Sequence, residues 1–171
     1  MINTRNYKLI SSVSTVYQQF KQGDIVFTRD YTSYTLTDTL THYFNYSLAH
    51  AVIITEENGI KYVLNATPGH YDNYILKKYK YIGNWTIVKE PLLEFILKYK
   101  CMYQVFRHKY PKPIQCKLPS HPTYCSQFVG TLLYESSILP ASAGILTPYT
   151  PERLIELLLE KGYRSFSFKH I

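Results

Sequence analysis

Three residues of this chain, Cys125, His50 and Asn65, are of the types that a thiol–imidazole catalyst uses. Cys125 begins a segment whose apolar residues recur at helical spacing, so we expect a helix over about 125–137 with Cys125 in its first turn. Backbone N–H groups project unpaired from a first turn, where they favour a thiolate and can hold an oxyanion. Cys125 is therefore a candidate nucleophile, and a packed structural cysteine is the alternative.

A candidate base, His50, lies in "SLAHAVIIT" (47–55), which we expect to form a strand. On a strand, His50 shares one face with Val52 and Ile54. A histidine among β-branched residues must find a partner or stay neutral. The alternative is a core histidine bonded to backbone.

Asn65 lies in the next expected strand, 60–67, after a turn signal at Asn58-Gly59. A two-residue turn makes His50 face Thr67, with Asn65 as the diagonal neighbour, whereas a four-residue loop makes His50 face Asn65 directly. Either register puts His50 and Asn65 on one face, about 5–8 Å apart. A side-chain carbonyl beside the imidazole can fix its tautomer and aim the ring, and Thr67 is the alternative orienting residue.

The remaining segments predict an α+β fold with a central antiparallel β-sheet packed against helices. Further helices are expected at 7–20, at 90–103, and from Pro151 with Thr150 as N-cap. Further strands are expected at 25–28, 74–82, 84–91 and, as an edge strand, 164–170. Residues 30–46 have no clear period and are expected to form a long loop. No repeat or linker divides the chain, so we expect a single domain over 1–171.

The composition is that of a globular protein, with 46% hydrophobic and 18% charged residues in 171. The net charge of +7 is spread over short groups, which is typical of a solvated face. It favours peripheral contact with anionic surfaces and predicts no specific nucleic-acid partner. Three cysteines do not indicate a disulfide framework, and the spacing of Cys101, His108, Cys116 and His121 matches no zinc pattern. We expect no metal and no cofactor.

Five motifs in this order carry a resemblance to a known superfamily: "GDIVF", "SLAHAVII", "YVLNATPG", "YCSQFVGTLLYESSIL" and "LTPYTPERL". Together they resemble the circularly permuted papain-like (NlpC-type) cysteine hydrolases, in the branch of the permuted papain-like amidases and the lecithin:retinol acyltransferase-like proteins. The similarity covers about residues 22–155. It implies that His50 is the base and Cys125 the nucleophile. The amidase-like members usually carry a glutamate where this chain has Asn65, which can orient imidazole but adds no negative charge.

The resemblance implies a cysteine hydrolase that cleaves an amide bond in a peptide or peptidoglycan-like substrate through a thioester. Tyr124 and the loop 30–46 are the expected substrate contacts. A lipid-directed phospholipase or acyltransferase of the same fold is one alternative, and a catalytically silent binding domain is another. The start of the chain lacks an apolar secretory region, so we expect a cytoplasmic location, in the host cytoplasm if the chain is viral.

Overall fold

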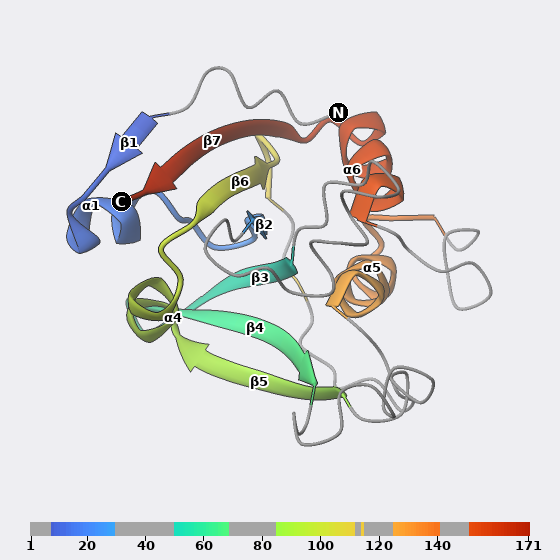
Figure 1. Cartoon of the computed structure of the whole chain (residues 1–171). Helices are drawn as coiled ribbons and strands as arrows, with labels where there is room; N and C mark the ends of the chain where they lie inside the picture. Colours follow the sequence, from blue (N-terminus) through green and yellow to red (C-terminus); the bar gives the residue numbers. More distant parts are fainter. Residues whose placement is uncertain (1–7, 30–49, 69–84, 112–113, 115–124, 141–150) are drawn as a thin grey trace, which may run out of the picture.

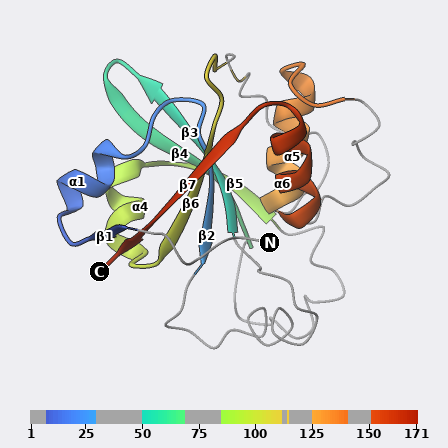
Figure 2. The ribbon, with the colours of Figure 1, turned by 90° about the horizontal axis from the view of Figure 1, so that it is seen from above.

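The computed structural model describes residues 8–29, 50–68, 85–111, 114, 125–140 and 151–171. In these ranges the chain forms a mixed α+β fold, a sheet with helices against both faces (Figures 1 and 2). The strands are β1 (Lys8–Ile10), β2 (Ile25–Arg29), β3 (His50–Glu57), β4 (Ile60–Pro68), β5 (Trp85–Pro91), β6 (Met102–Arg107) and β7 (Arg164–His170). The helices are α1 (Val13–Gln18), α4 (Leu92–Lys98), α5 (Cys125–Glu135) and α6 (Pro151–Glu160).

The seven described strands lie in the order β1-β7-β6-β2-β3-β4-β5. Every neighbouring pair is antiparallel except β1 and β7, which are parallel. The predicted central antiparallel sheet is therefore confirmed. The segment 164–170 does form a strand, but its assignment to the edge is wrong, because β1 pairs along its outer side.

The predicted helix over 7–20 is wrong in its first half. Residues Lys8–Ile10 form β1, and α1 begins only at Val13. Ser12 separates the two elements, because its hydroxyl accepts a hydrogen bond from the Thr15 N–H at 3.3 Å and caps the helix.

The predicted helix over 90–103 is also too long. Only Leu92–Lys98 is helical, and the chain re-enters the sheet as β6 at Met102. Because β6 is buried along nearly its whole length, its sequence is mostly apolar, with only Gln104 polar before Arg107, and does not alternate as a half-buried strand does. Periodicity cannot separate such a run from a buried helix.

The turn between β3 and β4 is the two-residue form. Asn58 and Gly59 have φ of 51° and 79°, as a type I′ hairpin turn requires. Glu57 pairs with Ile60, and the register continues to Ile53 with Leu64. Of the two registers considered, the one that makes Asn65 the diagonal neighbour of His50 is therefore present.

Two apolar cores lie on opposite faces of the sheet, and β3 contributes to both by strict alternation. Ala51 and Ile53 pack with α5 and α6, whereas Val52 and Ile54 pack with α1 and α4. Figure 2 shows these two helix layers on either side of the strands. Each face of β3 is thus covered by a different pair of helices.

A buried ion pair anchors β2 beside its neighbours. Asp24, which has no exposed surface, accepts hydrogen bonds from Arg107 Nε at 2.8 Å and Nη2 at 2.7 Å. The backbone of Asp24 also accepts a bond from the Ile54 N–H at 3.0 Å. The sequence predicted only a turn residue here, yet Asp24 ties the start of β2 to the end of β6 and to β3.

Several predicted features lie outside the described residues: the loop 30–46, the strand 74–82, Tyr124 and Thr150. The helix expected from Pro151 is present as α6, and Gly162 follows it with φ of +88°. None of the helices in the described ranges has the length and apolar character needed to cross a membrane.

Candidate active site

His50 and Asn65, proposed together from sequence, form a hydrogen-bonded pair. The Nε2 atom of His50 bonds to Oδ1 of Asn65. His50 is the first residue of β3, and Asn65 lies on the adjacent β4. Thr67 was the alternative partner, but its side chain is not among those that the structure describes.

The chemistry of the two atoms fixes the tautomer of the His50 ring. An amide oxygen can only accept a hydrogen bond, so Nε2 of His50 carries the hydrogen and donates it. The lone pair of the neutral ring then lies on Nδ1. Nδ1 is consequently the atom of His50 that can take a proton from another group.

The two side chains of this pair differ in burial. Asn65 is only 1% exposed, whereas His50 is half-buried. Thr28 of β2 pairs with His50, and its hydroxyl lies 3.5 Å from the His50 carbonyl oxygen. Sequence reasoning missed Thr28, because its relation to His50 depends on the β2–β3 register.

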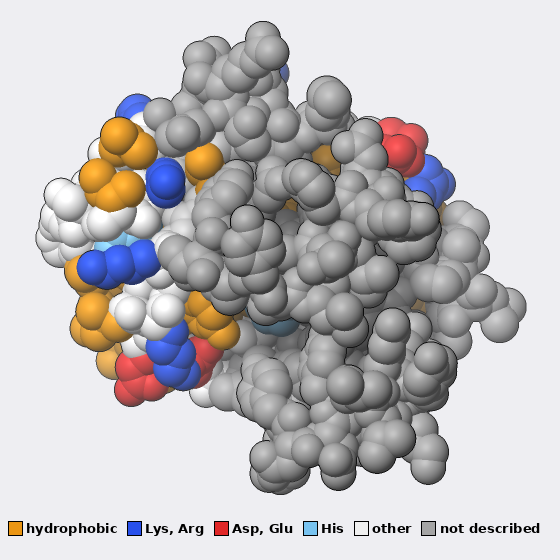
Figure 3. Space-filling view, in the orientation of Figure 1, with side chains coloured by type: hydrophobic (Ala, Val, Ile, Leu, Met, Phe, Trp, Pro, Cys, Tyr) orange, Lys and Arg blue, Asp and Glu red, His pale blue; other side chains and the backbone are white. Residues whose placement is uncertain are grey.

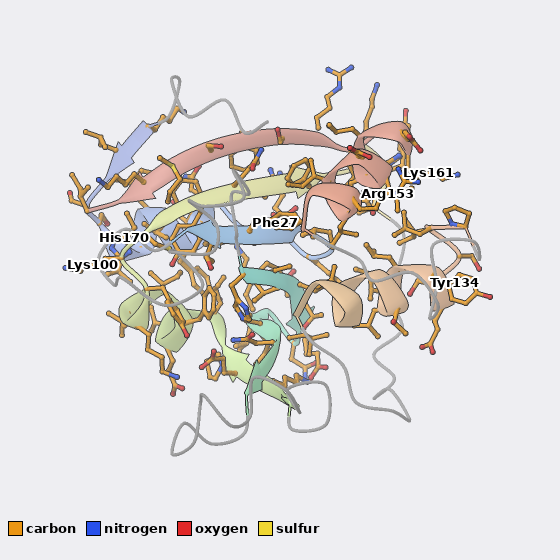
Figure 4. The ribbon with its side chains drawn as sticks, turned by 45° about the vertical axis from the view of Figure 1, so that its right-hand side comes forward. Phe27, Lys100, Tyr134, Arg153, Lys161 and His170 are labelled. Carbon is orange, nitrogen blue, oxygen red and sulfur yellow. The ribbon has the colours of Figure 1, made fainter. Side chains whose placement is uncertain are left out.

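Cys125 is the first residue of α5, as predicted. Val129, Leu132 and Leu133 of this helix are buried against the face of β3 that carries Ala51. Tyr134, near the far end of α5, points away from the sheet (Figure 4). The structure describes the backbone of Cys125 at the start of α5 but not its side chain.

The alternation of side chains along β3 shows which face of the sheet carries His50 and which faces α5. Ala51, the neighbour of His50, faces α5, whereas His50 shares its face with Val52. By this alternation His50 points to the α1 and α4 side of β3, and α5 lies on the other side. A contact between His50 and Cys125 therefore has to pass the end of β3 at which His50 begins the strand.

The two other described histidines have different surroundings. His108 is half-buried and lies between the Tyr110 N–H, which donates to its Nδ1 at 2.9 Å, and the Lys161 carbonyl, 3.1 Å from its Nε2. His170, near the C-terminus, is buried at the end of β7. No cluster of three or more His, Cys, Asp or Glu suitable for a metal occurs among the described residues.

Comparison of the chain with models of known families, with curated proteins and with solved structures found no match. The candidate site is therefore defined by its own geometry.

Proposed function

We propose that this protein is a cysteine-dependent hydrolase of amide bonds, with Cys125 as nucleophile, His50 as base and Asn65 as the residue that orients His50. The permuted papain-like fold inferred from the motifs belongs to the same proposal. The observation that carries it is the bond between His50 Nε2 and Asn65 Oδ1. This bond leaves Nδ1 as the basic atom, at the end of the strand beside the helix that begins at Cys125.

In the first half of the reaction, His50 Nδ1 takes the proton from the Cys125 thiol. The thiolate attacks the carbonyl carbon of the substrate, and the carbonyl oxygen becomes an oxyanion. Backbone N–H groups in the first turn of α5 have no partner within the helix and can stabilise this oxyanion. His50 then gives its proton to the leaving amine, and a thioester to Cys125 remains.

In the second half, water replaces the amine. His50 Nδ1 takes a proton from the water as the oxygen attacks the thioester, and the proton then returns to the Cys125 sulfur as it leaves. The products are a carboxylic acid and the free thiol. Asn65 keeps the ring plane constant through both halves because its oxygen holds Nε2–H throughout.

The test is a search for the thioester on Cys125. The purified protein is incubated with peptide amides, peptidoglycan fragments or phospholipid esters, quenched in acid and analysed by intact mass and peptide mapping. We expect a mass increase on Cys125 with a peptide-like amide substrate. Cys125→Ala should lose both the adduct and turnover, whereas Cys101→Ala, which alters a cysteine in the α1–α4 core, should keep both.

The outcomes separate the alternatives. An adduct formed only from phospholipid esters would replace the amidase with a lipid-directed enzyme of the same site. Turnover that survives in Cys125→Ala would contradict the proposed nucleophile. A folded protein that forms no adduct with any of these substrates would contradict the hydrolase and favour a binding domain.

A further inference from the structure

One end of the molecule exposes apolar side chains beside lysines. This end comprises β1, the last residues of β7 and the C-terminal end of α4, on the left in Figure 1. Leu9 is 62% exposed and Leu97 is 60% exposed, although both belong to regular elements. Figure 3 shows hydrophobic and basic side chains intermixed on this side. Scattered exposed leucines are ordinary, but a group of them beside cations is informative.

Backbone contacts bring these residues together from three segments. Leu9 of β1 pairs with Lys169 of β7. The Ile171 N–H donates to the Ile10 carbonyl at 3.0 Å, and the His170 N–H donates to the Cys101 carbonyl at 3.0 Å. The segment 99–101 leads directly from the end of α4 into β6, so the end of α4 adjoins β7. We call the following residues the basic–apolar patch: Lys8, Leu9, Leu97, Lys100, Lys169 and Ile171.

The lysines give the patch a positive charge. Lys8 and Lys100 are exposed, and neither has an ion-pair partner among the described residues. Glu90 is engaged by Lys98 at 2.8 Å. Glu94, exposed in the first turn of α4, lies about one turn before Leu97 and Lys98 and places a negative charge near Lys98.

We infer that the basic–apolar patch docks the protein onto an anionic lipid surface. Leucine side chains that protrude singly between lysines suit the boundary of a bilayer, where they enter the apolar layer while the ammonium groups meet anionic headgroups. The chain's net charge of +7 adds long-range attraction to the same surface. This inference is independent of the proposed catalysis.

The experiment is co-sedimentation of the full chain with vesicles of phosphatidylcholine alone and with vesicles that also contain phosphatidylserine. We expect binding to the anionic vesicles that weakens as salt is added. The double variant Leu97→Gln, Lys100→Glu should lower the partition coefficient about tenfold or more, since one lysine near such a surface contributes about fivefold. Lys100→Glu alone should give an intermediate loss.

A matched control lies at the other end of the molecule, on and after α6. Leu159 is 52% exposed and Lys161 is also exposed, and Figure 4 shows Lys161 far from Lys100. Leu159→Gln, Lys161→Glu makes the same chemical change and should leave vesicle binding unchanged. An equal loss in both double variants, equal binding to both vesicle types, or no binding to anionic vesicles would overturn the inference. Binding to an RNA oligonucleotide that the patch variant alone loses, without vesicle binding, would replace lipid with nucleic acid.

Discussion

His50 and His170 stand at ends of strands in one sheet, but their surroundings are opposite. His50 begins β3, is half-buried and bonds through Nε2 to Asn65. His170 ends β7 and is only 1% exposed, and neither of its ring nitrogens reaches a hydrogen-bond partner in the described part of the chain. Asn65 holds the His50 ring at Nε2, whereas burial around His170 disfavours the charged form of its ring.

In the proposed mechanism His50 transfers the proton, whereas burial disfavours the charged form of His170. Burial lowers the pKa of His170 below its ordinary 6.5, and the charge of Lys100 lowers it further, while the nearby Tyr99 backbone partly opposes both. A buried imidazole without partners costs free energy when it is charged. Position at a strand end therefore does not define a catalytic histidine, whereas an oriented second nitrogen and access to solvent do.

The largest expected effect comes from removing the base. His50→Ala should lower turnover of an amide substrate by about 10²–10⁴-fold, the usual contribution of general acid–base catalysis. Steady-state kinetics would measure it, with circular dichroism to confirm folding. His108→Ala, at a half-buried histidine bonded to backbone groups, is the matched control and should retain full activity. If turnover falls equally in the two variants, His50 is not the base.

Asn65→Ala should have the next largest effect. It removes the acceptor that fixes the His50 ring, and loss of orientation costs about tenfold to a hundredfold in kcat. Asn65→Asp keeps an acceptor oxygen at the same place and should retain more activity than Asn65→Ala. If kcat is unchanged in Asn65→Ala, the bond is structural and Asn65 has no role in positioning.

His170 should make the fold sensitive to acid. Its pKa is lowered in the folded chain, so as the pH falls below about 6.5 the unfolded chain binds a proton first, and the stability is lost progressively. One such group changes the free energy of unfolding by at most about 1.4 kcal/mol per pH unit. In urea titrations at pH 8 and pH 5, His170→Leu should lose less stability on acidification than the wild type. An identical loss in both proteins would show that His170 does not cause acid sensitivity.

The smallest effect should come from Lys100. The charge of Lys100 lowers the pKa of His170 less than burial does. Lys100→Met should therefore raise that pKa slightly, and it should reduce the loss of stability on acidification by less than His170→Leu does. The His170 pKa can be followed directly by NMR titration. If Lys100→Met restores most of the ordinary pKa of His170, the charge of Lys100 and not burial is the main cause of the lowered pKa.

Local sequence signals predicted the hairpin that carries the site. Asn58-Gly59 specifies a turn with two positive φ angles, and that turn sets the register that makes Asn65 the diagonal neighbour of His50. The start of α5 at Cys125 likewise follows from helical spacing after a proline-containing segment. These features depend on residues close together in the sequence.

Other features were beyond the reach of local signals because they depend on distant pairing. Strand β1 is only three residues long and exists through its pairing with β7, about 160 residues later. The run 102–107 is buried except at Arg107 and has no alternation of apolar and polar residues to reveal a strand. The Asp24–Arg107 pair and the position of Thr28 beside His50 likewise require the sheet order.

The most direct test of the account is the pH dependence of alkylation of Cys125 by iodoacetamide, read by peptide mass spectrometry in the wild type and in His50→Ala. The account predicts rapid alkylation of Cys125 well below pH 7 in the wild type, and loss of that low-pH reactivity in His50→Ala. Alkylation that follows an ordinary thiol pKa of about 8.5 in both proteins, or that occurs only after unfolding, would contradict the Cys125–His50 pair and with it the proposed hydrolase.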